Sequence, residues 1–376
     1  MKLVLKFIIT AFFICQASLY GQKISDDSLL KKARLEIYGN PDISIRIANQ
    51  LLKKEKDINK SISIYMLLST ANIAKRNFDE SLKYILKAKE LAQKTNDLKI
   101  RANVLVSVAI QYQQMELFSK SFETLNEADV YIEKLPQNAD EKYIETARSY
   151  AIRGMIYKSQ SNSEIALEKF LVSIKNFEKA ARSKPVYANM SVVYYNIGYC
   201  YINLNLMQNA NEAFIKSISY AQKATAKSLE AFALKGMAEM YKQNGENVTA
   251  LHLLSKAENL SKKTGDLVLN EGIYKEMADN YLALGKQNLY QYYHKKYFES
   301  LFKREQNELS SINHSIDNHN KETLKKIREM GAHYQYLRII IGVIGLIIIV
   351  LLLYFILKIR KQNLLYQKEI QKLIRS

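Results

Sequence analysis

Apolar and polar positions along residues 22–302 alternate with the period of an α-helix, and the helical stretches come in pairs joined by short polar turns. Residues 194–217 hold the clearest pair. The positions that share a helical face within it are Tyr194, Ile197, Gly198 and Tyr201 in the first helix and Ala210, Phe214 and Ser217 in the second. Because Gly198 and Ala210 are small, the two antiparallel helices are predicted to approach closely, with aromatic rings filling the seam around them.

This pair recurs in six registers that align on one small residue of each first helix. The small residues are Ser69, Ala109, Gly154, Gly198, Ala238 and Ala278, and the residues three positions later are Asn72, Tyr112, Tyr157, Tyr201, Tyr241 and Tyr281. Twelve positions later stand Ser81, Ser121, Ala166, Ala210, Ala250 and Tyr290, and sixteen positions later stand Ile85, Leu125, Phe170, Phe214, Leu254 and His294. Each pair leaves one apolar flank that only the next pair can cover, so we predict an all-α helical-hairpin solenoid. A further, weaker hairpin over residues 28–54 is expected to cap its N-terminal end.

The pattern of small, Tyr, Ala and aromatic positions resembles the tetratricopeptide repeat (TPR) family. The repeats are spaced by 40 to 45 residues instead of the usual 34, which indicates a variant with longer helices. In that family the first helices line the concave side, and their inward positions here would carry Asn103, Gln113, Arg148, Lys158, Tyr195, Asn203, Lys235, Lys242 and Lys275. Such a mixture of amides, Tyr and cations suits an extended or helical peptide with some acidic character, and a merely solvated surface is the alternative.

Composition supports a helical fold, since the 376 residues include only 12 Gly and 3 Pro. A net charge of +18 is compatible with nucleic-acid binding, but the basic residues are scattered along polar helix faces. We therefore expect a solvated basic surface and no nucleic-acid partner. Of the two cysteines, Cys15 lies in an N-terminal apolar segment, so Cys200 is expected to be a small buried hydrophobic residue without a disulfide partner.

Residues 1–21 have the layout of an export signal. Lys2 and Lys6 precede an apolar run over residues 7–15, and small and polar residues follow that run. The run is too short to span a bilayer comfortably, which favours a cleaved signal over a membrane anchor. The repeat array, residues 22–302, is then expected to lie outside the cytoplasm.

Three further segments follow the repeats. Residues 303–337 are polar with apolar positions at coiled-coil spacing, which predicts a stalk helix. Residues 338–357 contain an uncharged run of about 28 Å at 1.5 Å per residue, which predicts a transmembrane helix. Residues 358–376 are basic, and an a/d-like seam with Asn363 predicts a short cytoplasmic helix. Together these segments indicate a single-pass protein of the inner (cytoplasmic) membrane that is able to form a parallel homodimer through the stalk and post-membrane helices.

The sequence carries none of the short motifs that mark catalytic or cofactor sites. Gly-rich phosphate loops, Cys-x-x-Cys, His-Glu-x-x-His and Gly-x-Ser-x-Gly are all missing, so neither an enzyme nor a cofactor or metal site is expected. The order of segments resembles the sensor half of bacterial TPR-containing histidine kinases and helix-turn-helix regulators. Only a short helix follows the candidate span, and no output domain can fit in it.

Two interpretations follow from this organisation. In the first, a peptide or protein bound to the extracytoplasmic groove changes the pairing of the membrane and post-membrane helices, and a separate output domain responds. In the second, the chain is a static membrane-tethered scaffold that gathers envelope proteins. Disrupting the seam at Ile370 and Leu373 would abolish signalling in the first case and change nothing in the second.

Overall fold

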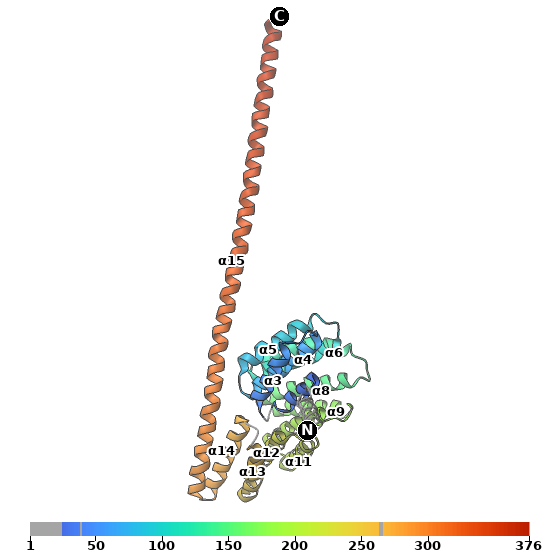
Figure 1. The fold of residues 1–376 in the computed structure, drawn as a ribbon, viewed down its shortest axis with the longest axis vertical. Coiled ribbons are helices and arrows are strands. Elements are labelled where there is room, and N and C mark those ends of the chain that lie inside the picture. Colours follow the sequence, from blue (N-terminus) through green and yellow to red (C-terminus); the bar gives the residue numbers. More distant parts are fainter. Residues whose placement is uncertain (1–24, 38–39, 263–265, 376) are drawn as a thin grey trace, which may run out of the picture. The chain divides into compact units, whose positions relative to one another are not determined.

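The computed structural model describes residues 25–37, 40–262 and 266–375, and every regular element in these ranges is an α-helix (Figure 1). The prediction of an all-α fold is therefore confirmed. The predicted export signal, residues 1–21, lies outside the described residues. Residues up to 312 form one compact unit and residues from 313 onward form a second, and the two are described separately.

The first unit is a row of helical hairpins in chain order. The N-terminal hairpin, which corresponds to the weak pair expected over residues 28–54, consists of α2 (Asp26–Leu35) and α3 (Pro41–Leu52). The first helices of the following hairpins are α4 (Ile58–Ala74), α6 (Leu98–Gln114), α8 (Asp140–Ser159), α10 (Lys184–Asn203), α12 (Lys227–Gln243) and α14 (Leu267–Ala283). Their second helices are α5 (Phe78–Ala92), α7 (Phe118–Glu133), α9 (Ser163–Phe177), α11 (Met207–Lys223), α13 (Asn247–Ser261) and the start of α15 (Gln287–Arg375).

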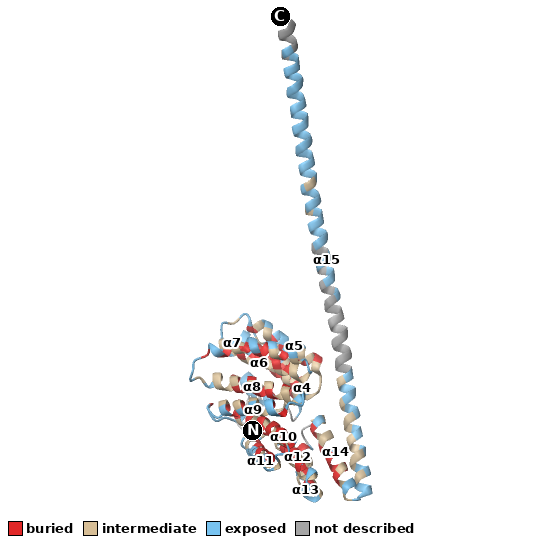
Figure 2. Cartoon of the chain, turned by 180° about the vertical axis from the view of Figure 1, so that it is seen from behind, coloured by how far each residue is buried: buried red, intermediate tan, exposed pale blue. Residues whose placement is uncertain are grey.

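First and second helices form two separate layers of this array. The backbones of successive first helices from α4 to α14 pack against one another, whereas the described second helices meet through side-chain ion pairs, such as that of Lys89 on α5 with Glu127 on α7 at 2.7 Å. Neighbouring hairpins also meet where a second helix packs on the following first helix, as α11 does on α12. The closer spacing of the first helices places them on the inner side of the array. Figure 2 shows the buried residues concentrated where these helices face one another.

The packing inside the hairpins follows the predicted register. In the hairpin of α10 and α11, Gly198 lies directly against the fully buried Phe214 ring, and a Cβ atom at Gly198 would come within 2.7 Å of a ring carbon. Gly154 faces Phe170 in the same way, at 2.6 Å. Glycine is therefore required at these two positions because the ring of the partner helix occupies the space of a side chain.

Where serine takes part in the facing pair, a hydrogen bond replaces the contact between glycine and ring. The Ser81 hydroxyl donates to the carbonyl oxygen of Ser69 at 2.9 Å, and the Ser121 hydroxyl donates to the carbonyl oxygen of Ala109 at 2.8 Å. The other small residues of these seams are almost completely buried: Ala166, Ala210, Ala238, Ala250 and Ala278. The predicted tyrosines pack on the same clusters and are partly buried: Tyr157, Tyr201, Tyr241 and Tyr281.

Each first helix from α4 to α14 ends in the same tight turn. Seven positions after the small residue, the backbone is left-handed with φ between 57° and 78°, at Arg76, Glu116, Ser161, Asn205, Gly245 and Gly285. The following amide donates back across the turn, as the Leu117 N–H does to the Tyr112 carbonyl oxygen at 2.8 Å. This is a Schellman motif, which satisfies the last carbonyl groups of the helix and sets its angle to the next one.

The last hairpin departs from the predicted register. Tyr290 and His294 occupy the positions that hold a small residue and a large apolar residue in the other repeats, but both are only partly buried and their ring centroids lie 5.0 Å apart. Instead, Tyr293 of α15 stacks on Tyr281 of α14 with ring centroids 5.5 Å apart. The large Tyr290 side chain stands where the other second helices have a small residue, so α15 packs on α14 through the neighbouring face that carries Tyr293.

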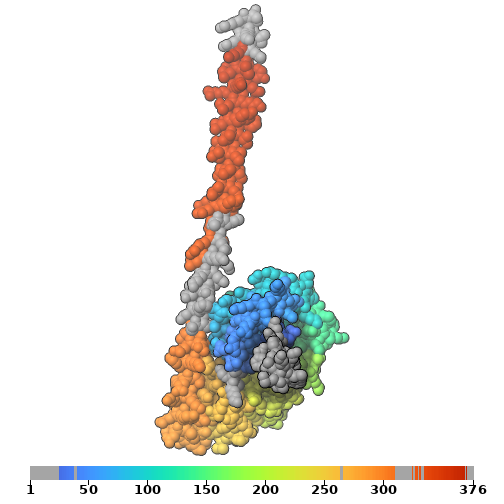
Figure 3. Space-filling model, viewed as in Figure 1, coloured from blue at the N-terminus to red at the C-terminus, as the bar shows by residue number. Residues whose placement is uncertain are grey.

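An ion-pair chain joins the second hairpin to the last one. Arg76, in the turn between α4 and α5, contacts Glu308 of α15 at 2.6 Å. Arg304 pairs with the same Glu308 at 2.9 Å and with Glu271 of α14 at 2.6 Å. We call these four residues the closing network, because they hold together hairpins that are far apart in the sequence. Figure 3 shows the face on which the N-terminal helices (blue) and the start of α15 (orange) are both visible.

The second unit is the continuation of α15, which runs without a break to Arg375. The predicted stalk, membrane and post-membrane segments are therefore parts of one helix. Within it, Tyr334–Lys368 is the one stretch in the described chain that is long and apolar enough to cross a membrane, judged by length and composition. None of this stretch is buried. The second unit thus exposes a long apolar surface.

Candidate functional site

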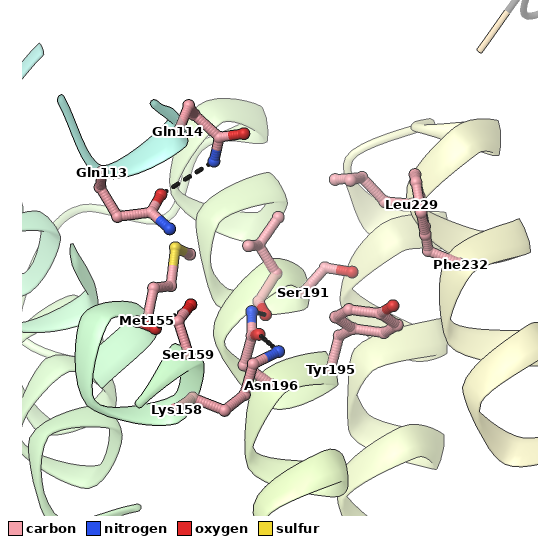
Figure 4. A pocket seen from close by; sticks show the side chains of 11 residues that line it. Gln113, Gln114, Met155, Lys158, Ser159, Ser191, Tyr195, Asn196, Leu229 and Phe232 are labelled. Atoms are coloured by element: carbon pink, nitrogen blue, oxygen red, sulfur yellow. Dashed lines mark hydrogen bonds between the residues drawn. The ribbon is translucent and has the colours of Figure 1, made fainter. Parts of the chain in front are cut away.

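A cavity of about 300 Å³ opens on the inner layer of the array (Figure 4). Four successive first helices, α6, α8, α10 and α12, contribute its lining, so a ligand in this pocket would contact four hairpins at once. The lining residues are Gln113, Gln114, Met155, Lys158, Ser159, Ser191, Val192, Tyr195, Asn196, Leu229 and Phe232. The pocket thus lies where the family resemblance places a peptide groove.

One wall of the pocket is aromatic and aliphatic. The Tyr195 ring meets the Phe232 ring edge-on with centroids 5.8 Å apart, and it meets the Tyr199 ring in the same way at 4.9 Å. Burial raises the pKa of Tyr195, so its phenol stays protonated. Together with Leu229, the rings of Tyr195 and Phe232 offer a surface that suits an apolar side chain. Met155 lies on the other side of the pocket, near Gln113 (Figure 4).

The opposite side of the pocket presents amide groups. The Gln114 side-chain nitrogen donates to the side-chain oxygen of Gln113 at 2.9 Å (Figure 4). In the described chain no hydrogen bond is made by the Gln113 nitrogen or by the Gln114 oxygen, so one donor and one acceptor remain. Paired donor and acceptor groups of this kind match the N–H and C=O groups of an extended peptide backbone.

Lys158 lies between these two sides. Its Nζ donates to Oδ1 of Asn196 at 2.5 Å and lies 5.4 Å from the centre of the Tyr199 ring and 5.9 Å from that of Tyr195. The Asn196 side-chain nitrogen donates to the Val192 carbonyl oxygen at 2.8 Å, which turns Oδ1 toward the lysine. Burial lowers the pKa of Lys158 because the charged form is removed from water.

The other predicted cations of the inner layer have carboxylate partners. Arg148 donates to Glu145 at 2.7 Å and to Asn103, another predicted groove residue, at 2.9 Å. Burial raises the pKa of Glu145, and the arginine beside it opposes that shift. These side chains satisfy one another and hold α6 to α8.

Lys235 and Lys242 are likewise engaged. Lys235 forms an ion pair with Glu239 and donates to the Tyr199 hydroxyl at 3.1 Å. Lys242 pairs with Glu276 at 2.7 Å, which joins α12 to α14. The sequence analysis proposes both lysines as ligand contacts, whereas the structure gives each a partner within the array.

The remaining predicted groove residues lie away from the pocket. Lys275 is exposed on α14. Asn203 is exposed at the end of α10, where its amide donates to the Ser163 hydroxyl at 3.0 Å. Of the nine predicted residues, the structure brings together Gln113, Lys158 and Tyr195 around the cavity.

Most of the apolar and small lining residues are not among the predicted groove residues. The predicted set already uses the positions six before and five after the small residue, which hold Arg148 and Asn203 in two of the hairpins. Phe232 and Ser159 line the pocket from these same positions in other hairpins, so a choice limited to amides, tyrosine and cations excluded them. Met155, one after the small residue, lies further round the same helix at a position that the prediction did not use.

Cys200 is free and buried, as expected, and burial raises its pKa to about 11. A thiol with so high a pKa is protonated and unreactive at neutral pH. No group of three or more His, Cys, Asp or Glu side chains arranged to hold a metal ion occurs among the described residues. The described pocket presents amides, aromatic rings and one cation.

Comparisons with known proteins agree with this architecture. Residues 192–223, which cover the second half of α10 and all of α11, match the model of the tetratricopeptide repeat. No curated protein sequence matches the chain. The match falls on the hairpin in which the repeat register is clearest.

Several solved structures have a similar fold. The Rap conjugation gene regulator of plasmid pLS20, in complex with the Phr* peptide, has a TM-score of 0.57 at 13% identity, over 76% of this chain and 74% of that one. NprR in complex with its cognate peptide NprX has a TM-score of 0.55 at 14% identity, over 80% and 86%. A Rap protein complexed with Competence and Sporulation Factor has a TM-score of 0.54 at 15% identity, over 81% and 90%. At such identities the likeness shows the fold alone, a TPR-like helical-repeat array.

Proposed function

We propose that this chain is a membrane-anchored receptor for a peptide or for an extended segment of a protein, which binds across the inner faces of α6, α8, α10 and α12. The observation that carries the proposal is the pocket shared by these four helices, with an apolar wall on one side and an amide pair on the other. Two solved structures of similar fold, a Rap conjugation gene regulator and NprR, are complexes with peptides, which is consistent with a peptide as the ligand class.

The membrane part of the proposal rests on α15. Its stretch Tyr334–Lys368 is apolar and exposed, and a bilayer around it would remove this apolar surface from water. With the export signal expected over residues 1–21, the array would lie outside the cytoplasm and the C-terminal end of α15 inside it. A parallel pair of such helices, with Asn363 in the seam, is the homodimer that we propose for this segment.

The continuity of α15 favours a sensor over a static scaffold. The helix that pairs with Arg76 through Glu308 is the same helix that carries the candidate span. The array and the candidate membrane segment are therefore joined by the same helix. We propose that ligand binding is passed along α15 to a separate output protein, and a scaffold for envelope proteins is the second candidate.

A selection from a random peptide library tests the binding proposal. The target is the full-length protein in lipid nanodiscs, and affinities of selected peptides are measured by fluorescence anisotropy. Ser159→Trp places a large ring at the exposed edge of the pocket, so selected peptides are expected to lose at least about tenfold in affinity. Ile215→Trp, on the outer helix α11 where the residue is half exposed, is the matched control and is expected to leave affinity unchanged.

Two results would overturn the proposal. One is a selection that yields no peptide whose affinity depends on Ser159. The other is an equal loss on Ile215→Trp, which would show that binding does not distinguish the inner layer from the outer one.

A further inference from the structure

Lys158 is a partly buried cation that lines the pocket, and it has no carboxylate partner in the described chain. In the described chain Arg148, Lys235 and Lys242 each form an ion pair, whereas Lys158 meets only the side-chain oxygen of Asn196 and two tyrosine rings. A neutral oxygen compensates a buried ammonium group less well than a carboxylate does. Lys158 thus contributes a positive charge to the pocket that the described protein does not neutralise.

The surroundings of Lys158 do not supply the missing charge. Glu239 is the carboxylate that acts on Lys158 electrostatically, but it is in direct contact with Lys235. Lys235 itself acts on Lys158 with the same sign of charge. The ion pair of Lys235 with Glu239 therefore leaves Lys158 without a direct carboxylate contact.

Polar and apolar contacts for a ligand meet at this point. Lys158 lines the same cavity as Tyr195 and Phe232, whose rings are in edge contact. The Gln113 nitrogen, a donor without a partner in the described chain, lines it from α6. An anionic group at Lys158 would thus have a cation and an amide donor on one side and an apolar wall on the other.

We propose that the pocket selects peptides that present a carboxylate to Lys158 and an apolar side chain, adjacent in the peptide, to the wall of Tyr195 and Phe232. This inference rests on the proposed function and specifies its ligand class. The carboxylate belongs either to an Asp or Glu side chain or to the peptide's C-terminus, since both present the same two oxygens. In either case the carboxylate forms the ion pair that Lys158 lacks in the array alone.

The test is a cycle of protein and peptide variants. Peptides selected on the full-length protein in nanodiscs are resynthesised in three forms: unchanged, with each Asp or Glu replaced by Asn or Gln, and with an amidated C-terminus. Anisotropy is measured on the wild type and on Lys158→Met, which keeps a long unbranched side chain and removes the charge. This variant is expected to fold, because it deletes a buried charge that lacks a carboxylate partner.

On the wild type, one of the two neutralised peptides is expected to bind about tenfold to hundredfold more weakly than the unchanged peptide. A loss with the Asn or Gln form identifies a side-chain carboxylate, and a loss with the amidated form identifies the C-terminus. On Lys158→Met the same neutralisation is expected to change affinity less than about twofold. Lys275→Met, at an exposed lysine of α14, is the matched control and should reproduce the wild-type pattern.

The outcomes separate the two proposals. Peptides that lose affinity on Ser159→Trp but bind equally well with and without their carboxylates would overturn the role of Lys158 and leave the groove intact. The same conclusion follows if neutralisation weakens binding equally on the wild type and on Lys158→Met. If no selected peptide is sensitive to Ser159→Trp, both the groove and the carboxylate preference are rejected.

Discussion

Phe214 sets the distance between helices on two sides of itself. A Cβ atom at Gly198 of its own hairpin would lie 2.7 Å from a ring carbon, and one at Gly236 of the next hairpin would lie 2.6 Å away. The ring is fully buried, so it has little room to move. Glycines on α10 and α12 therefore close on one ring from both sides, which fixes the packing within a hairpin and between hairpins together.

Gly198→Ala is expected to destabilise the array by about 1–2 kcal/mol, because overpacking against Phe214 outweighs the helix propensity that alanine adds. The measurement is denaturant unfolding of the full-length protein in detergent, followed by circular dichroism. Gly331→Ala is the control, since a Cβ atom there would meet nothing within 4 Å, and no loss is expected. Equal stability of wild type and Gly198→Ala would show that the seam is looser than described.

The uncompensated charge of Lys158 predicts a pH dependence. Burial lowers the pKa of Lys158 below 10.5, so the unfolded chain binds this proton more tightly than the folded chain does. The charged lysine therefore reduces the free energy of unfolding at neutral pH, and this reduction disappears as pH rises toward 10.5. The stability of the wild type relative to Lys158→Met should therefore increase between neutral and alkaline pH. Melting temperatures of both proteins across this range measure the difference, and a constant or shrinking value would contradict the assignment.

At the scale of the element, the turns that end the first helices share one backbone conformation although their residues differ. The left-handed position is Gly in two hairpins and Arg, Glu, Ser or Asn in the other four. A left-handed backbone costs a non-glycine residue about 1 kcal/mol or more, so these turns persist because the Schellman hydrogen bonds and the packed helices on either side hold them. Sequence reasoning finds the helix pairs but cannot place a turn that carries no glycine signal.

Glu116→Gly is expected to stabilise the array by about 1 kcal/mol, because glycine adopts the left-handed backbone at residue 116 without steric cost. Glu123→Gly, at an exposed position within α7, is the matched control and is expected to destabilise by about 1 kcal/mol. Urea unfolding of the two variants gives both values. Losses of the same size at both sites would mean that residue 116 is not under backbone strain.

At the scale of the whole array, the closing network joins residues that lie 232 positions apart, as Arg76 and Glu308 do. Side chains of this pair are 24% and 20% exposed, so the contact is better shielded from water than an ordinary surface ion pair. The sequence shows both residues but gives no reason to pair them. Their meeting depends on the accumulated rotation of all the hairpins between them, which no local pattern encodes.

A double-mutant cycle on Arg76→Ala and Glu308→Ala is expected to give a coupling free energy of about 1 kcal/mol, at the upper end for surface pairs. Lys54 and Asp26, which are paired with 52% and 53% of their side chains exposed, form the control cycle and should couple by only a few tenths of a kcal/mol. A coupling near zero for Arg76 and Glu308 would show that the array does not close through this pair in solution.

The parts of the fold that were predictable are those in which local chemistry repeats. Small residues such as Gly154 and Ala210 mark the seams because a larger side chain would be excluded there. The groove was predicted only in part, because the inward face of a first helix depends on how far neighbouring hairpins rotate. Lys235 shows the difference: its position is on the inner layer as expected, but Glu239 one turn later engages it.

Amide hydrogen exchange of the full-length protein, with and without a selected peptide, tests most directly whether the inner layer is the binding surface. We expect added protection in α6, α8, α10 and α12, whose residues line the pocket, and little change in the outer helices α7, α9, α11 and α13. Protection confined to the outer helices, or an equal change in both layers, would contradict this expectation.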